Sequence, residues 1–175
     1  MTAKRQHLPH KGFTLIEVVI AVAFFLTLVF ISLPMADVVD VFRLDHTNQR
    51  LYNSFQYARS EALKQGGVVS VCPSADGAAC ATDWDSGWIV FVNPDRDGVV
   101  DTGENVLRVY GALSGRLDLT WGGNNNWVTF NPRGNSDESG TFILCMTGRL
   151  VGPIRTVTVS AIGRVRKASL TGDCI

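Results

Sequence analysis

Residues 11–34 read KGFTLIEVVIAVAFFLTLVFISLP, and this stretch decides how the rest of the chain is organised. From Phe13 to Met35 it contains one charged residue, Glu17. About 20 apolar residues in a helix cross the roughly 30 Å hydrocarbon core of a bilayer, so the stretch predicts a membrane segment. An unpaired carboxylate at the bilayer centre costs about 2.5–3.5 kcal/mol or more. Glu17 is therefore a candidate functional residue; the plainer alternative is a carboxylate that reaches the interface from near a helix end.

The segment GFTLIE, from Gly12 to Glu17 behind a short basic leader, resembles the class III signal of type IV pilins and type II secretion pseudopilins. The resemblance implies that a prepilin peptidase cuts between Gly12 and Phe13 and methylates the new amine of Phe13. It also implies that Glu17 acts in assembly, by pairing with the Phe13 amine of a neighbouring subunit. A secretory signal peptide fits less well, because its apolar region would span only about 7–15 residues.

Three segments are expected on this basis. Residues 1–12 form a prepilin leader, residues 13–36 form a transmembrane and filament-core helix, and residues 37–175 form a globular head that includes the second half of the helix. The resemblance implies a single-pass inner-membrane protein with a periplasmic head before assembly, and a cell-surface pilus subunit afterwards. Other pilins would be its partners in the filament.

The helix is expected to continue past Pro34, where a kink or local break should occur because proline lacks a backbone donor. It should end at Gln65, before the strong stop signal Gly66-Gly67. Between these points, residues recur at alternating spacings of four and three, which predicts one buried helical face. The residues of this face are Leu44, Asn48, Leu51, Phe55, Ala58 and Ala62.

Short β-branched and aromatic runs follow the helix, separated by Gly, Asn, Asp and Pro, and each run predicts a strand. The candidates are Val68–Val71, Trp88–Val92, Val106–Tyr110, Leu117–Trp121, Trp127–Phe130, Thr141–Cys145, Thr156–Ala161 and Arg164–Ser169. One long helix before seven or eight short strands predicts an α+β fold with an antiparallel sheet. Together with the signal segment, this pattern implies the type IV pilin fold.

Four cysteines in a chain expected to cross the inner membrane indicate disulfides. Cys72 and Cys80 suit a small stapled loop, which leaves Cys145 to pair with Cys174. Four cysteines allow three pairings, and we expect this sequential one. A metal–thiolate site is not expected, because no Cys-x-x-Cys occurs and the three histidines lie far from the cysteines.

Several further segments resemble the GspH/FimT family of minor pilins and pseudopilins. They are ARSEALK at 58–64, VSVCPS at 69–74, Cys80, GWIVFV at 87–92 and VLR at 106–108. The similarity extends over almost the whole chain after the leader. It implies a minor subunit rather than the abundant shaft subunit of a filament.

The C-terminal run Gly163-Arg-Val-Arg-Lys167 is the main candidate for binding. Residues 139–172 contain five basic residues and no acid, whereas residues 66–138 contain ten acids and four bases. In an extended segment Arg164 and Arg166 point to the same side, where two guanidinium groups can engage phosphates. GRxR near the C-terminus resembles the DNA-binding motif of FimT-type minor pilins. We therefore expect sequence-independent DNA binding in natural transformation. The expected DNA-binding residues are Gly163, Arg164, Arg166, Lys167, Arg149 and Arg155. The alternative is a solvated edge strand whose charges discourage aggregation.

Residues 93–104, NPDRDGVVDTGE, match the spacing of an EF-hand calcium loop, and the candidate ligands are Asn93, Asp95, Asp97, Asp101 and Glu104. The flanking segments look like strands, so an Asp/Gly-rich hairpin turn explains the same residues without a metal. No cofactor is expected. The chain contains no Gly-x-Ser-x-Gly and no phosphate-binding P-loop motif, and it has no histidine beyond residue 46, so an enzyme is not expected. The competing function is a structural one, as a GspH-like pseudopilin or a pilus-priming minor pilin.

Overall fold

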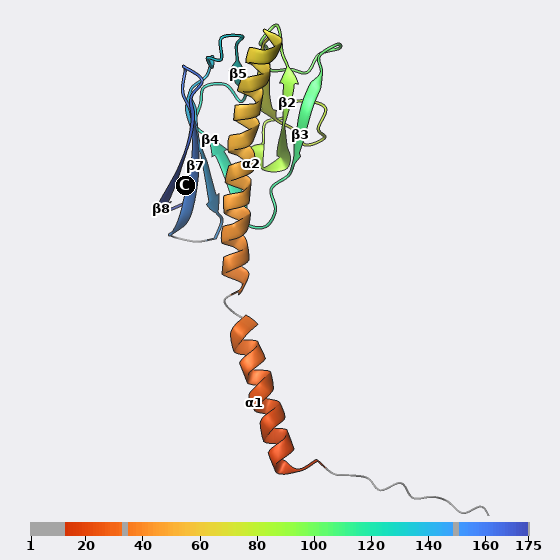
Figure 1. Cartoon of the computed structure of the whole chain (residues 1–175), viewed down its shortest axis with the longest axis vertical. Coiled ribbons are helices and arrows are strands. Elements are labelled where there is room, and N and C mark those ends of the chain that lie inside the picture. The colour runs from red at the N-terminus through yellow and green to blue at the C-terminus, as the bar shows by residue number, and fades with distance from the viewer. Residues whose placement is uncertain (1–12, 33–34, 149–150, 175) are drawn as a thin grey trace, which may run out of the picture. The chain divides into compact units, whose positions relative to one another are not determined.

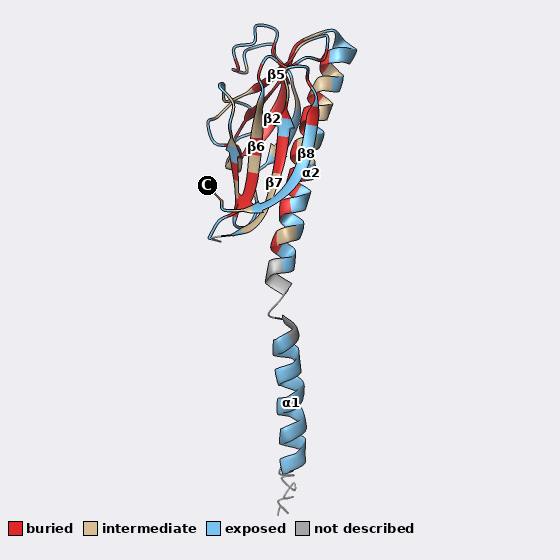
Figure 2. Cartoon of the chain, turned by 90° about the vertical axis from the view of Figure 1, so that its left-hand side faces the viewer, coloured by how far each residue is buried: buried red, intermediate tan, exposed pale blue. Residues whose placement is uncertain are grey.

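The structure, a computed structural model, describes residues 13–32, 35–148 and 151–174. These residues divide into two compact units, one that ends at Val38 and one that begins at Val39. Helix α1 (Leu15–Ser32) belongs to the first unit. The side chains of residues 13–30 are exposed (Figure 2). Among the described residues, no helix combines the length and the apolar character that a membrane crossing demands. The break expected at Pro34 and the cleavage site at Gly12 lie outside the described residues.

Helix α2 (Met35–Gln65) carries the head of the protein. Its predicted inner face is confirmed, because five of the six residues are fully buried and the sixth, Asn48, is 7% exposed. The helix ends at Gly66, whose positive φ of 61° is the left-handed conformation that commonly terminates helices.

The chain after α2 folds into two antiparallel four-stranded sheets that flank the helix (Figure 1). One sheet has the order β3-β2-β1-β5 and the other β4-β6-β7-β8. The first contains β1 (Val69–Pro73), β2 (Gly87–Val92), β3 (Val106–Gly111) and β5 (Val128–Phe130). The second contains β4 (Leu117–Trp121), β6 (Gly140–Met146), β7 (Gly152–Val159) and β8 (Val165–Gly172). A 3₁₀ turn, η1 (Trp84–Ser86), precedes β2. This architecture confirms the predicted α+β fold.

A single main core joins α2 to both sheets. Phe55 of α2 lies 5.1 Å from Phe142 of β6, and Trp84 packs edge-on against the same phenylalanine at 4.7 Å. Trp88 and Phe130 of the other sheet are fully buried. Burying aromatic side chains of this size provides the largest hydrophobic contributions in a small domain. The core therefore fixes both sheets, and with them strand β8, on one helix.

Strand β7 begins at Gly152, four residues earlier than the predicted start at Thr156. Gly152 and Pro153 read as strand breakers, which is why the prediction was wrong. Their pairing explains the difference: Gly152 to Ile154 pair with β8, whereas the register with β6 covers only Arg155 to Val159. Proline is tolerated where one side of a strand has no ladder partner.

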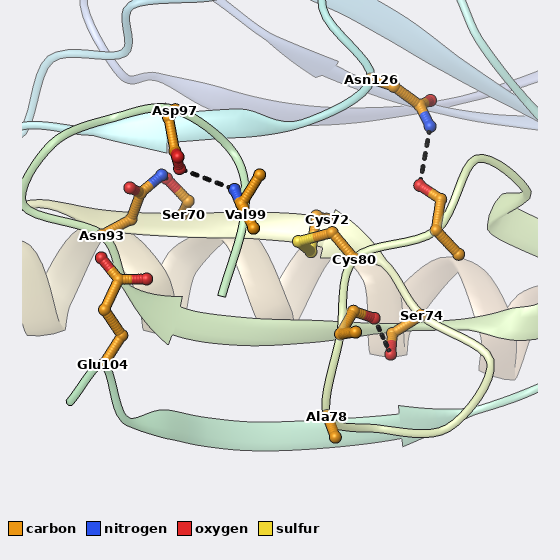
Figure 3. Close-up of a disulfide and its surroundings, with 12 residues drawn as sticks. Ser70, Cys72, Ser74, Ala78, Cys80, Asn93, Asp97, Val99, Glu104 and Asn126 are labelled. Atoms are coloured by element: carbon orange, nitrogen blue, oxygen red, sulfur yellow. Dashed lines mark hydrogen bonds between the residues drawn. A yellow bond between two sulfur atoms is a disulfide. The ribbon is translucent and has the colours of Figure 1, made fainter. Parts of the chain in front are cut away.

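Both disulfides of the sequential pairing are present. Cys72 and Cys80 join β1 to the following loop (Figure 3), with Cα atoms 5.6 Å apart. Cys145 and Cys174 join β6 to the residues after β8, with Cα atoms 5.7 Å apart. The second bridge therefore anchors the C-terminal end of the edge strand β8.

An ion-pair cluster fastens the β3–β4 connection to the start of α2. Arg116 Nη2 lies 3.0 Å from Asp40 Oδ2, and Arg43 Nη1 lies 3.2 Å from Asp40 Oδ1. The hydrogen bond from Arg116 is the main cause that lowers the pKa of Asp40, against the opposing effect of partial desolvation. Asp40 therefore keeps its charge to a lower pH than an unpaired aspartate does.

Candidate functional site

The GRxR run starts in the tight turn between β7 and β8. Ser160 N donates to Arg164 O at 3.1 Å, and Arg164 N donates to Ser160 Oγ at 3.1 Å. Gly163 N donates to Ser160 O at 2.7 Å and Gly163 has a φ of 70°. The turn is thus closed by its own backbone and by one serine side chain, and it presents Arg164 immediately before β8.

Gly163 is buried against a second loop. A Cβ on Gly163 would lie 1.8 Å from Gly134 O, which leaves no room for any side chain. Arg59 Nε of α2 donates to the same carbonyl at 2.9 Å, and Ser136 N donates to Ala161 O at 3.0 Å. Gly163 therefore seats the turn through close packing against Gly134. Its predicted part in DNA binding stays a prediction.

Sequence reasoning missed Arg59 and Gly134 as parts of this arrangement. The run Asn-Pro-Arg-Gly at 131–134 is a recognisable turn signal. Nothing in it indicates, however, that the loop docks onto a turn about 30 positions later. That contact exists only because the core brings β5 and β7 to the same end of α2.

The basic residues of β8 point to opposite faces, as the period of two requires. Val165 is buried in the core, and Lys167, on the same face, lies 4.9 Å above the Tyr52 ring. Lys167 Nζ also donates to Gln49 Oε1 of α2. Arg166 lies on the other face, opposite the exposed Thr158 of β7. Lys167 therefore does not lie on the face of β8 that carries Arg166.

Arg164 and Arg166 are both exposed. Most of the edge strand β8 is exposed as well (Figure 2). Within residues 13–32, 35–148 and 151–174, neither guanidinium has a hydrogen-bond or ion-pair partner. Two unpaired guanidinium groups on one short segment form a site of locally high positive charge. Such a site can hold an anion without first breaking an internal contact.

Arg155 does not join this pair. Its Nε lies 2.6 Å from Asp45 Oδ1 on α2, and its side chain is only 15% exposed. The prediction placed Lys167 in the binding patch because it follows Arg166, and Arg155 because no acid lies in this third of the chain. The structure instead directs both side chains toward α2, where Arg155 is neutralised by an acid 110 positions away. Arg149 lies outside the described residues.

The acidic loop at 93–104 is built around Asn93, which is fully buried. Asn93 Nδ2 donates to Ser70 Oγ at 2.8 Å, and the two side chains lie together in Figure 3. Asn93 Oδ1 accepts from Arg96 N at 2.9 Å, so both polar ends of this side chain have partners. Carboxylate oxygens of Asp95, Asp97 and Asp101 come within 4.8 Å of one another. Glu104 Oε2 instead accepts from Asp101 N at 3.0 Å. The structure does not bring the five candidate ligands together as an EF-hand set, and Asn93 serves the turn.

Glu17 lies in the first turn of α1, where its backbone N donates to Thr14 Oγ1 at 3.3 Å. Phe13, Glu17 and five apolar residues of the next turns line a shallow groove along the helix. The five are Val18, Ala21, Val22, Phe25 and Leu26. This groove is almost entirely apolar, with the Glu17 carboxylate as its charged member.

Comparison with known proteins identifies the family. Residues 47–163 match the family described as GspH, type II transport protein, which is more than half of the chain. No match was found among curated proteins. A crystal structure of the type IV minor pilin FimU of Pseudomonas aeruginosa has a TM-score of 0.55 and 24% identity, and the alignment covers 73% of this chain and 89% of that chain.

The minor pseudopilin EpsH from the type 2 secretion system of Vibrio cholerae has a TM-score of 0.54 and 15% identity, and the alignment covers 73% of this chain and 97% of that chain. Both similarities concern the fold, a helix packed on antiparallel sheet. The match over residues 47–163 shows that this chain belongs to the GspH family, and the two structures show that it shares the fold of FimU and EpsH.

Proposed function

We propose that the chain is a minor type IV pilin that binds DNA without sequence preference through Arg164 and Arg166 and supports DNA uptake in natural transformation. The observation that carries the proposal is that the guanidinium groups of Arg164 and Arg166 are exposed and have no partner among the described residues. The side chains of Arg155 and Lys167, in contrast, are held by α2. Unpaired arginines suit phosphate oxygens, which they can engage with two parallel hydrogen bonds.

A few phosphate contacts give weak and salt-dependent binding, with Kd typically near 10⁻⁴–10⁻⁶ M at physiological salt. That strength suits a machine that must hold any DNA and then release it. Several subunits along one filament would raise the overall affinity by multivalency. The acids outnumber the bases in the chain after the leader, by 16 to 13, so binding must depend on a local patch.

We also propose that residues 13–36 anchor the protein in the inner membrane before assembly and form part of a filament core with other pilins afterwards. The exposed apolar side chains of α1 and its groove beside Glu17 support this proposal. Prepilin peptidase would cut after Gly12, and Glu17 would pair with the Phe13 amine of a neighbour. Such a pair would offset the cost of placing a carboxylate in an apolar environment.

The test compares two neighbouring residues on opposite faces of β8. Arg166→Gln and Lys167→Gln each remove one positive charge, and DNA binding is measured with the full chain in uncharged detergent and a labelled duplex. The logarithm of the binding constant falls with the logarithm of the salt concentration, with a slope of about −0.9 per phosphate contact. At 0.1 M salt each contact therefore raises the binding constant about eightfold. We expect Arg166→Gln to weaken binding about eightfold and Lys167→Gln less than about twofold, since its charge faces the helix.

A purely structural role, as a pseudopilin of type II secretion or a pilus-priming pilin, is the second candidate, favoured by the description of the family. If the unaltered chain does not shift the duplex at low salt, this structural role replaces DNA binding. If Lys167→Gln and Arg166→Gln weaken binding equally, the assignment to the outer face of β8 is wrong.

A further inference from the structure

We propose that Arg133 is a third phosphate contact, which extends the surface of Arg164 and Arg166 onto the loop at 131–135; this inference rests on the proposed function. The loop lies beside the turn that presents Arg164, and Arg133 is exposed. Among the described parts of the chain, its guanidinium has no hydrogen-bond or ion-pair partner.

The Asn131 side chain holds the loop in a fixed conformation. Its Oδ1 accepts from Arg133 N at 2.9 Å and from Asn135 N at 3.2 Å. The backbone adds two further bonds, from Asn131 N to Asn135 O at 2.9 Å and from Gly134 N to Asn131 O at 2.8 Å. A residue on a loop tied in this way is presented with little loss of backbone entropy when a ligand binds.

The contact between Gly134 and Gly163 limits the distance between the Cα atoms of Arg133 and Arg164. A Cβ on Gly163 would lie 1.8 Å from Gly134 O, so the two glycine Cα atoms are at most about 6 Å apart. One Cα–Cα step on each side then places the Cα atoms of Arg133 and Arg164 within about 14 Å of each other. Phosphates of one DNA strand follow at about 3.4 Å along the axis, so one backbone segment can meet both residues.

The neighbouring Arg96 shows the contrast. Arg96 and Arg133 line one open hollow of about 350 Å³ with Asn131 and Pro132. Arg96 Nη1 lies 3.0 Å from Asp137 Oδ2, so the charge of Arg96 is already compensated. Arg133 has no such acidic partner in the part of the chain that the structure describes. The hollow has the volume of roughly ten water molecules, which leaves room for a phosphodiester group beside Arg133.

The experiment measures DNA affinity against salt for the full chain in uncharged detergent, with a labelled duplex as the probe. The variants are Arg133→Gln, the pair Arg164→Gln with Arg166→Gln, and Arg43→Gln as matched control. Arg43 is partly exposed and lies far from the proposed surface. Its partner Asp40 stands 19 residues before Arg59, the α2 residue that contacts the loop of Arg133, which is about 28 Å along the helix. Asp40 keeps its bond to Arg116 in this control.

Arg133→Gln is expected to reduce the salt slope by about 0.9 and to weaken binding about eightfold at 0.1 M salt, while Arg43→Gln changes neither. If the Arg164 and Arg166 pair lowers the slope but Arg133→Gln does not, the role of Arg133 is refuted and the proposed function stands. The role of Arg133 is refuted as well if Arg43→Gln has an equal effect. If no variant changes the binding, both proposals fail together.

Discussion

Replacing Gly163 by alanine tests whether this glycine seats the turn before β8 through steric necessity. Gly163 has a φ of 70°, and a non-glycine residue in the left-handed region costs about 1–2 kcal/mol. The new Cβ would also lie 1.8 Å from Gly134 O, so backbone must move. Overpacking of this kind typically costs about 1–3 kcal/mol. The expected loss in the free energy of unfolding is therefore about 2–5 kcal/mol.

Gly66→Ala provides the matched control. Gly66 has nearly the same φ, 61°, but nothing lies within 4 Å of the position its Cβ would occupy. Only the conformational cost of about 1–2 kcal/mol should apply. The assay is urea unfolding followed by tryptophan fluorescence, since all four tryptophans lie in the head. If Gly163→Ala is no more destabilising than Gly66→Ala, the close contact with Gly134 does not exist as described.

Two further predictions concern the bonds that hold the head together. Replacing both cysteines of the Cys145–Cys174 bridge by serine opens a loop whose ends are 29 residues apart in the sequence. Loop-closure entropy predicts that the free energy of unfolding falls by about 3.6 kcal/mol. For the shorter Cys72–Cys80 loop, with a separation of 8, the expected loss is about 2.6 kcal/mol. Chemical denaturation of the two double variants shows which of them is less stable, and a larger loss for the Cys72–Cys80 variant would contradict the entropic account. Asp40 has a lowered pKa in the folded protein, so its stabilising effect is present above a pH of about 4 and is lost as the pH falls through the folded pKa. The melting temperature of the unaltered protein should therefore fall more between pH 5 and about pH 3 than that of Asp40→Asn, and equal falls would assign acid sensitivity to other groups.

The helical face and most strands could be predicted because they depend on local periodicity. Leu44, Leu51 and Phe55 recur at helical spacing, and the structure buries all three. The start of β7 could not be predicted, because Pro153 looks like a breaker until its pairing with β8 alone is known. The local sequence pattern therefore predicts which helices and strands form, whereas the residues at which a strand begins and ends depend on the neighbouring strands in the sheet.

The candidate site could be predicted only as far as strand alternation extends. Alternation placed Arg164 and Arg166 on one side, and the structure leaves both exposed. The partner of Arg155 is Asp45, which is 110 positions away, so no window of sequence shows that this cation is neutralised. The seating of Gly163 on Gly134 likewise depends on a tertiary contact.

Whether Arg164 and Arg166 contact DNA is decided by the slope of log K against log salt for duplex DNA. The unaltered full chain and the variant with both Arg164→Gln and Arg166→Gln are compared in uncharged detergent. Two lost phosphate contacts should reduce the magnitude of the slope by about 1.8 and weaken binding about 60-fold at 0.1 M salt. An unchanged slope in the double variant would show that these two arginines do not contact DNA.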